Sequence, residues 1–249
     1  MRPSVVLVSL LVTLLVTSGC GGARGPVPSP SPTPSATSPP PSAAPARHPP
    51  SSSARRPEHV VAVPYAASGE YEVVPGDAPA RPGSGEVVRY LVEVERGLPF
   101  NGQRFAAAVH RALNDPRGWA RFERVDHEPV WVRVALSSPS LTNQQCRPLN
   151  TGDELSCWNG TRSIINARRW AKGVPGYGHD LAGYRDYVVN HEVGHSLGHE
   201  HAVCPGPGQP APVMVQQSKS LGGCLPNPWP FPSQGQERQE RSETEDRPQ

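Results

Sequence analysis

Residues 191–201 read HEVGHSLGHEH, which places four histidines, two glutamates and two glycines in eleven positions. His191 and His195 are four residues apart, so on a helix their side chains lie on one face, one turn apart. At that spacing two imidazoles can bind one Zn²⁺ at about 2.0–2.1 Å. Glu192 lies about 100° further around the helix, where its carboxylate can reach a metal-bound water as a general base. The stretch therefore predicts a helical zinc site.

The third zinc ligand depends on where this helix ends. Gly198 is expected to end it, because glycine readily adopts the left-handed conformation that follows many helix C-termini. The chain can then turn back and bring His201 to the metal. Were the helix to continue, His199 would lie one turn beyond His195 and compete as the third ligand. We expect the helix to end and His201 to be the ligand, with Glu200 a solvated or neighbouring carboxylate.

The helix that carries the histidines is predicted to begin after the N-cap Asp180 and to run to about Leu197. Tyr184 lies near the histidine face of this helix, whereas Val189 and Val193 lie on the opposite side. A helix that is apolar on both sides is buried between two layers of structure. We therefore expect it to form the floor of a cleft.

Alternating and helical patterns predict the elements that precede this helix. In order, they are a strand over residues 86–95, a helix over residues 101–114 capped by Asn101, and strands near residues 120–125 and 130–136. The pair Asn159-Gly160 predicts a two-residue hairpin turn, whose second arm is a strand over residues 163–169. Four tryptophans are expected to pack in the core and against the hairpin: Trp119, Trp131, Trp158 and Trp170.

The stretch HEVGHSLGHEH fits the pattern H-E-x-x-H-x-x-G-x-x-H and resembles the zinc signature of the metzincin metallopeptidases, especially the matrixin version. The resemblance implies that His191, His195 and His201 are the zinc ligands and that Glu192 is the general base. It also implies an α+β fold. This fold is a metzincin-like (zincin) domain with a twisted, mostly parallel sheet, a long active-site helix and an irregular C-terminal part.

Metzincins also carry a methionine in a tight turn below the metal. Met214 lies in the stretch PVMVQQ, thirteen residues after His201, where the resemblance implies such a Met-turn. The intervening segment HAVCPGPGQPAPVM is longer and richer in proline than its counterpart in matrixins. We therefore expect the chain to belong to a family of secreted high-GC bacterial proteins that is related to metzincins.

The first twenty residues, MRPSVVLVSLLVTLLVTSGC, follow the pattern of a secretory signal, with Arg2 before an apolar run and small residues after it. The apolar run is shorter than the roughly 20 residues of a typical membrane span. The residues TSGC resemble the bacterial lipobox, which implies that Cys20 is lipidated and anchors the protein to the outer face of the cell membrane. The alternatives are ordinary cleavage near Ser18 or Gly19 with free secretion, or an uncleaved N-terminal anchor.

Composition divides the rest of the chain into three parts. Residues 21–57 are nearly all Pro, Ser, Ala, Gly and Thr, and such a segment buries too little apolar surface to fold, so we expect a disordered tether. Residues 58–232 are expected to form one zinc metallopeptidase-like domain, long enough to bury a core. Residues 233–249 are polar and are expected to form a disordered tail.

Four cysteines remain after Cys20, and an even number in an exported chain suggests two disulfides. Three pairings are possible. We favour the two local bridges, Cys146–Cys157 and Cys204–Cys224. A zinc–cysteine site is a weaker interpretation, because the sequence contains no C-x-x-C spacing.

The net charge of +2 is small, and no basic run with interleaved aromatic residues is present. Nucleic acid is therefore not an expected partner, and we expect a monomer. Lys172 and Lys219 are the only lysines among 24 Lys and Arg residues. The arginine excess, with abundant Ala, Pro and Gly, is typical of proteins from high-GC bacteria.

These features predict a secreted or lipid-anchored zinc metalloendopeptidase that hydrolyses a peptide or protein substrate with Glu192 as general base. The substrate is expected to lie along an edge strand near residues 163–169. One alternative is a non-catalytic cell-surface lipoprotein with a structural zinc, closed by His199 or Glu200 as a fourth ligand. Another is a zinc-dependent hydrolase of a different amide, such as a cell-wall cross-link.

Overall fold

The computed structural model describes residues 61–233 of the chain. The predicted signal peptide with Cys20, the tether over residues 21–57 and the tail beyond residue 233 lie outside the described residues. The predictions made for those segments therefore remain predictions.

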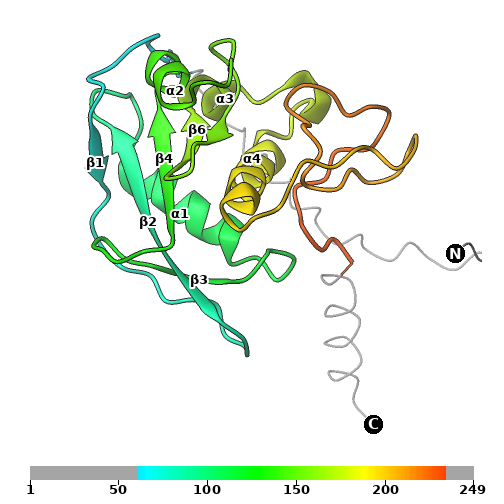
Figure 1. The fold of residues 1–249 in the computed structure, drawn as a ribbon, viewed down its shortest axis with the longest axis horizontal. Coiled ribbons are helices and arrows are strands. Elements are labelled where there is room, and N and C mark those ends of the chain that lie inside the picture. Colours follow the sequence, from blue (N-terminus) through cyan, green and yellow to red (C-terminus); the bar gives the residue numbers. More distant parts are fainter. Residues whose placement is uncertain (1–60, 234–249) are drawn as a thin grey trace, which may run out of the picture. The chain divides into compact units, whose positions relative to one another are not determined.

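A six-stranded sheet runs through the described residues in the order β1-β2-β4-β6-β5, and β3 also pairs with β2 (Figure 1). The central pairs β2–β3, β2–β4 and β4–β6 are parallel, whereas β1 and β5 pair antiparallel with their neighbours. The strands are β1 (Tyr71–Val73), β2 (Val87–Glu95), β3 (Arg121–Arg124), β4 (Val132–Ser137), β5 (Cys157–Trp158) and β6 (Ser163–Asn166). The domain is thus mixed α/β with a mostly parallel sheet, compatible with the expected α+β class.

Two long helices pack against one face of this sheet. They are α1 (Gly102–Leu113) and α4 (Leu181–Ser196), and their apolar side chains join those of β2, β4 and β6 in one buried core. Both predicted N-caps are confirmed, because Asn101 Oδ1 accepts from the Arg104 amide at 2.9 Å and Asp180 Oδ1 accepts from the Gly183 amide at 2.8 Å. Three short helices complete the fold: α2 (Pro139–Gln145), α3 (Ala167–Lys172) and the 3₁₀ helix η1 (Pro175–Tyr177).

The other face of the sheet carries two buried carboxylates that have structural partners. Glu95 accepts from the backbone amides of Gly69 at 2.9 Å and Ser138 at 2.6 Å. Glu93 pairs with Arg133 at 3.1 Å and Arg162 at 2.6 Å. Since each buried charge is hydrogen-bonded or paired, neither is a free acid available for chemistry.

The predicted strand over residues 163–169 is too long. Strand β6 ends at Asn166, whose side-chain oxygen accepts from the Arg168 amide at 2.9 Å and so caps α3. The expectation that this strand forms an edge is also wrong, since β6 lies between β4 and β5. The edge strand is β5, which is only two residues long and therefore has too few residues to show an alternating pattern.

The tryptophans divide between the core and the surface. Trp170 is buried and Trp119 is half-buried, as expected of packing residues. Trp131 and Trp158 are instead 75% and 38% exposed, so the expectation that they pack in the core is wrong. Both line a surface groove together with Gly160 and Thr161.

Both local disulfides are confirmed. Cys146–Cys157 joins the end of α2 to the edge strand β5, and Cys204–Cys224 closes a loop within the segment that follows α4. Within the described residues this C-terminal segment contains no helix or strand, only the isolated bridges Ala202–Val215 and Pro210–Leu225. The irregular C-terminal part was expected. It appears in orange to red beside α4 in Figure 1.

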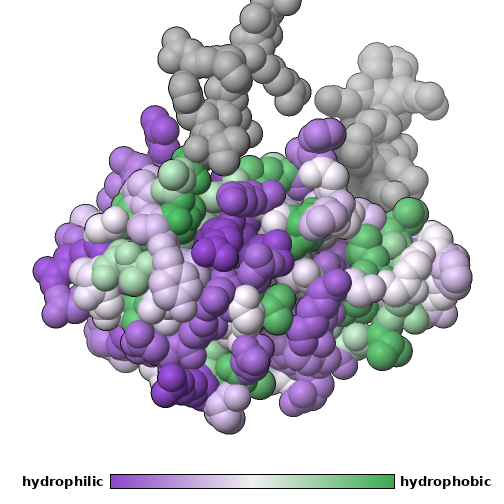
Figure 2. All heavy atoms as spheres, turned by 90° about the horizontal axis from the view of Figure 1, so that it is seen from above, coloured by the Kyte–Doolittle hydropathy of each residue, from purple (hydrophilic) through white to green (hydrophobic). Residues whose placement is uncertain are grey.

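The surface of the domain is mixed in character. Figure 2 shows one face, on which apolar side chains form small patches separated by polar ones. Scattered apolar residues of this kind are normal on a surface that faces water. Among residues 61–233, no helix has the length and apolar character needed to cross a membrane.

Candidate metal site

The end of helix α4 determines which histidines can meet. Gly198 has a φ of +90°, in the left-handed region that favours glycine, and the chain leaves the helix there as predicted. The Gly198 amide donates to the His195 carbonyl and the His199 amide donates to the Gly194 carbonyl, both at 3.0 Å. These two bonds form a Schellman motif, which turns the following residues back towards the helix.

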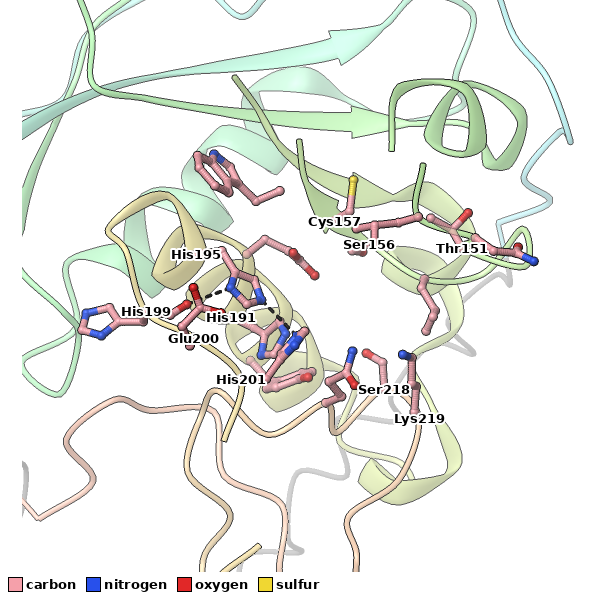
Figure 3. A pocket seen from close by; sticks show the side chains of 17 residues that line it. Thr151, Ser156, Cys157, His191, His195, His199, Glu200, His201, Ser218 and Lys219 are labelled. Carbon is pink, nitrogen blue, oxygen red and sulfur yellow. Dashed lines mark hydrogen bonds between the residues drawn. The ribbon is translucent and has the colours of Figure 1, made fainter. Parts of the chain in front are cut away.

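Three histidine side chains converge beside this turn. His191, His195 and His201 each offer one ring nitrogen, and these three atoms all lie within 4.8 Å of one another. The Nε2 atoms of His195 and His201 are 3.1 Å apart. Figure 3 shows the three rings turned towards a common point at the pocket.

Backbone carbonyls orient two of the three rings. His191 Nδ1 lies 2.9 Å from the Val213 carbonyl, and His195 Nδ1 lies 2.8 Å from the His199 carbonyl. Because a carbonyl oxygen only accepts, each Nδ1 donates to it, and Nε2 is the nitrogen left to face a metal. Burial also lowers the pKa of His191 to about 3, so its ring is neutral, as a metal ligand must be.

The donor set fits a zinc ion. Tetrahedral bonds of about 2.0–2.1 Å require ligand nitrogens roughly 3.3 Å apart, close to the 3.1 Å between His195 Nε2 and His201 Nε2. Three neutral imidazoles form a donor set that binds Zn²⁺ in known catalytic sites and leaves one coordination position free. The three predicted ligands are therefore brought together in a group that could hold a metal ion.

His199 lies outside this group. Its ring stacks on the Trp119 indole at 4.0 Å between centroids, while its carbonyl holds the His195 ring. In Figure 3 the His199 side chain points away from the three converging rings. Trp119 is in turn held by a hydrogen bond from Nε1 to the Asn190 carbonyl at 2.8 Å. Stacking on Trp119 therefore keeps the alternative ligand away from the site.

Glu192 lies on the same helix with a side chain that is only 5% exposed. Its carboxylate lines the pocket and makes no hydrogen bond or ion pair with another of the described residues. Burial raises the pKa of this carboxyl to about 8. A divalent cation beside it would favour the ionised form, as any nearby opposite charge does. A buried carboxylate without a protein partner is a suitable proton acceptor.

Met214 lies under helix α4, where the resemblance implied a Met-turn. The Val215 amide donates to the Pro212 carbonyl at 2.9 Å and closes a tight turn around it. The Met214 carbonyl accepts from the Ala202 amide at 2.9 Å, and the neighbouring Val213 carbonyl holds His191. This turn therefore supports both the helix and the chain that leads away from His201.

The sulfur of Met214 packs so closely against Gly194 that no side chain fits there. A Cβ at Gly194 would lie 2.6 Å from Met214 Sδ and 3.1 Å from Trp119 Cζ2. Gly→Ala within a helix normally stabilises by roughly 0.5–1 kcal/mol. Here we expect Gly194→Ala to lower the free energy of unfolding by about 1–3 kcal/mol through overpacking, measured by urea denaturation. A more stable variant would contradict the packing described.

The converging histidines open into a pocket of about 320 Å³. Helix α4 forms its floor, and residues 149–151 and 155–158, which lead into β5, form one wall. The opposite wall is formed by Gln216, Ser218 and Lys219, just after the Met214 turn. The pocket is thus a cleft with the candidate metal site at its base, as the sequence led us to expect of this helix.

The resemblance to metzincins also implied that the region after Met214 forms a wall of the side-chain pocket. Tertiary hydrogen bonds hold this second wall in place. Tyr177 donates to Gln217 Oε1 at 2.9 Å, Tyr187 donates to the Val215 carbonyl at 3.0 Å, and Tyr184 bonds the Ser218 hydroxyl at 3.1 Å. Burial raises the pKa of all three tyrosines, so their hydroxyls stay protonated. The tyrosines lie on η1 and α4 and fix the wall to the helix that carries the histidines.

One family model matches residues 59–224, from before β1 to the second cysteine of the last disulfide. The chain belongs to the DUF3152 family. The description of this family is "protein of unknown function". No curated protein and no solved structure matches the chain. The DUF3152 match includes His191, His195, His201, Glu192 and Met214, so the candidate metal site lies within the family domain.

Proposed function

We propose that this DUF3152 protein is a zinc-dependent metalloendopeptidase of the metzincin-like type. We also propose that it is secreted, with Cys20 as a lipid anchor to the outer face of the membrane. The observation that carries the proposal is the convergence of His191, His195 and His201 at the base of a pocket that also contains the buried, unpaired Glu192.

The absence of a fourth protein ligand beside the three rings supports a catalytic rather than a structural zinc. Structural zinc sites are usually closed by four protein ligands, whereas catalytic sites keep one position open. Among the described residues, the metal-ligating group contains His191, His195 and His201 alone. The stacking of His199 on Trp119 argues against its closing the site.

In the proposed reaction, the metal ion and the protein side chains have different roles. A bound Zn²⁺ would supply Lewis acidity towards the scissile carbonyl and lower the pKa of a water to about 7. Glu192 would accept the proton of the attacking water and pass it to the departing amine nitrogen. The Val213 and His199 carbonyls would hold the His191 and His195 rings in place throughout.

The edge strand β5 is the proposed guide for the substrate backbone. Cys157 and Trp158 pair with β6 on one side and line the pocket beside the histidines. An extended peptide can add to such an edge through main-chain hydrogen bonds. This replaces the earlier expectation for residues 163–169, because β6 has no free edge.

Metal removal tests the proposal directly. The purified protein is loaded with one equivalent of Zn²⁺ and incubated with a diverse peptide library, and cleavage sites are read by mass spectrometry. We expect cleavage of internal peptide bonds that stops with a chelator and returns when zinc is restored. A protein that binds zinc tightly yet cleaves nothing would support the structural-zinc alternative, and one that binds no zinc would refute both.

A further inference from the structure

The pocket wall after Met214 carries one of the two lysines of the chain. We propose that Lys219 binds a substrate carboxylate close to the scissile bond, so that the preferred substrates are peptides with an acidic group beside the cleaved amide. This inference rests on the proposed peptidase function. It concerns which substrate is chosen, rather than how the bond is broken.

The backbone of Lys219 is held firmly relative to the histidines. Its amide donates to the Gln216 carbonyl at 2.8 Å, which closes a turn over residues 216–219. The neighbouring Gln217 side chain is buried, accepts from Tyr177, and donates to the Asn227 carbonyl at 2.8 Å. Ser218 is bonded to Tyr184 of α4. The lysine is therefore presented from a fixed position at the pocket, although its side chain is exposed to solvent.

The charge of Lys219 is not used within the protein. No carboxylate of residues 61–233 forms a salt bridge with it, and the other residues of the two pocket walls, among them Asn150, Thr151, Gln216 and Ser218, are neutral. Figure 3 shows Ser218 and Lys219 on the side of the pocket that faces Thr151, away from His199. This end of the pocket therefore offers a cation without a counter-ion.

Lys219 lines the same pocket as the three converging histidines. A substrate amide held at the histidines therefore has its flanking groups inside the pocket that Lys219 lines. The pocket carboxylates are Glu192, buried on the floor, and Glu200, which is exposed and adjacent to His201 in the sequence. A substrate carboxylate is the missing partner at the Lys219 end.

Two sources can supply that carboxylate, namely an Asp or Glu side chain and the free C-terminus of a short peptide. Both would be recognised by the same ammonium, which acts as a compact point charge with three donors. Partial desolvation between the two walls would strengthen the pair relative to a fully exposed one. An exposed ion pair strengthens binding by up to about fivefold. We therefore expect a preference of about fivefold for the acidic peptide.

Matched peptides test the proposal. Each set differs only in Glu or Gln at the positions that flank the cleaved bond, with either a free or an amidated C-terminus. Cleavage (kcat/KM) is measured with the zinc-loaded wild type and with Lys219→Gln, Lys219→Glu and Lys172→Gln. Lys172 lies on α3 outside the pocket and is the matched control. Binding of the same peptides to zinc-loaded Glu192→Gln protein, with and without Lys219→Gln, is measured by fluorescence anisotropy.

We expect the wild type and Lys172→Gln to prefer the acidic peptide by about fivefold, Lys219→Gln to lose the preference, and Lys219→Glu to reverse it. The amidated set shows whether the carboxylate comes from a side chain or the terminus. A preference that survives Lys219→Gln, or no preference at all, would overturn the inference while leaving peptidase activity standing. Lys219-dependent binding without cleavage by any variant would support the inference and refute the peptidase function.

Discussion

Glu192→Gln is expected to lower kcat/KM for peptide cleavage by about 10²–10⁴-fold, the range attributed to a general base. The substitution keeps the size of the side chain and removes only its ability to accept a proton. Because Glu192 is not one of the three converging ligands, the variant should bind zinc as tightly as the wild type. The neutral amide also removes the need to bury a carboxylate, so stability should not fall.

The measurement combines zinc content, zinc affinity by competition with a chromophoric chelator, and steady-state cleavage of one peptide identified in the library. Glu200→Gln is the matched control, because it makes the same chemical change at another acidic residue of the pocket, one that is exposed. We expect its activity to stay within a few-fold of the wild type. A zinc-loaded Glu192→Gln protein with full activity would rule out the proposed base.

His201→Ala has the second large expected effect, on zinc affinity. Removing one of three imidazole ligands is expected to weaken binding by more than the 10–100-fold typical of losing an outer hydrogen bond to a ligand. The side chain is part of the converging group, and its Nε2 lies 3.1 Å from that of His195. Cleavage at limiting zinc should fall in parallel with the zinc occupancy.

His199→Ala is the control for this experiment, since it removes an imidazole only two residues away. Its ring stacks on Trp119, so we expect a modest loss of stability and little change in zinc affinity. Competition with a chelator, measured on both variants, shows which of the two histidines contributes to zinc affinity. If His199→Ala loses zinc and His201→Ala keeps it, the assignment of the third ligand is wrong.

Much of the candidate site could be predicted because its geometry is local. The four-residue spacing of His191 and His195, the Asp180 cap and the Gly198 stop each act within one or two turns of helix α4. A cap or a left-handed glycine works through bonds to its nearest neighbours, so a sequence pattern is enough to predict it. The two disulfides likewise join cysteines that are 11 and 20 residues apart.

The wrong predictions concern features that depend on contacts between distant parts of the chain. The edge of the sheet was assigned to β6, because the two-residue strand β5 shows no alternating pattern of its own. Trp131 and Trp158 were expected to pack in the core and against the hairpin, but both are exposed. Burial of an aromatic side chain depends on which residues pack over it. In each case the residue types agreed with the prediction. The residues that other parts of the chain place beside them decided the outcome differently.

The sequence by itself determined the helix that carries the histidines, its ends, the order of its candidate ligands and the local cysteine pairs. The tertiary structure alone decided that Trp119 stacks on His199, that β5 is the edge beside the pocket, and that three buried tyrosines hold the segment next to Lys219. Helical spacing, caps and turns are set by the nearest few residues. Which side chains face one cavity is set by the packing of segments tens of residues apart, and no local pattern records that packing.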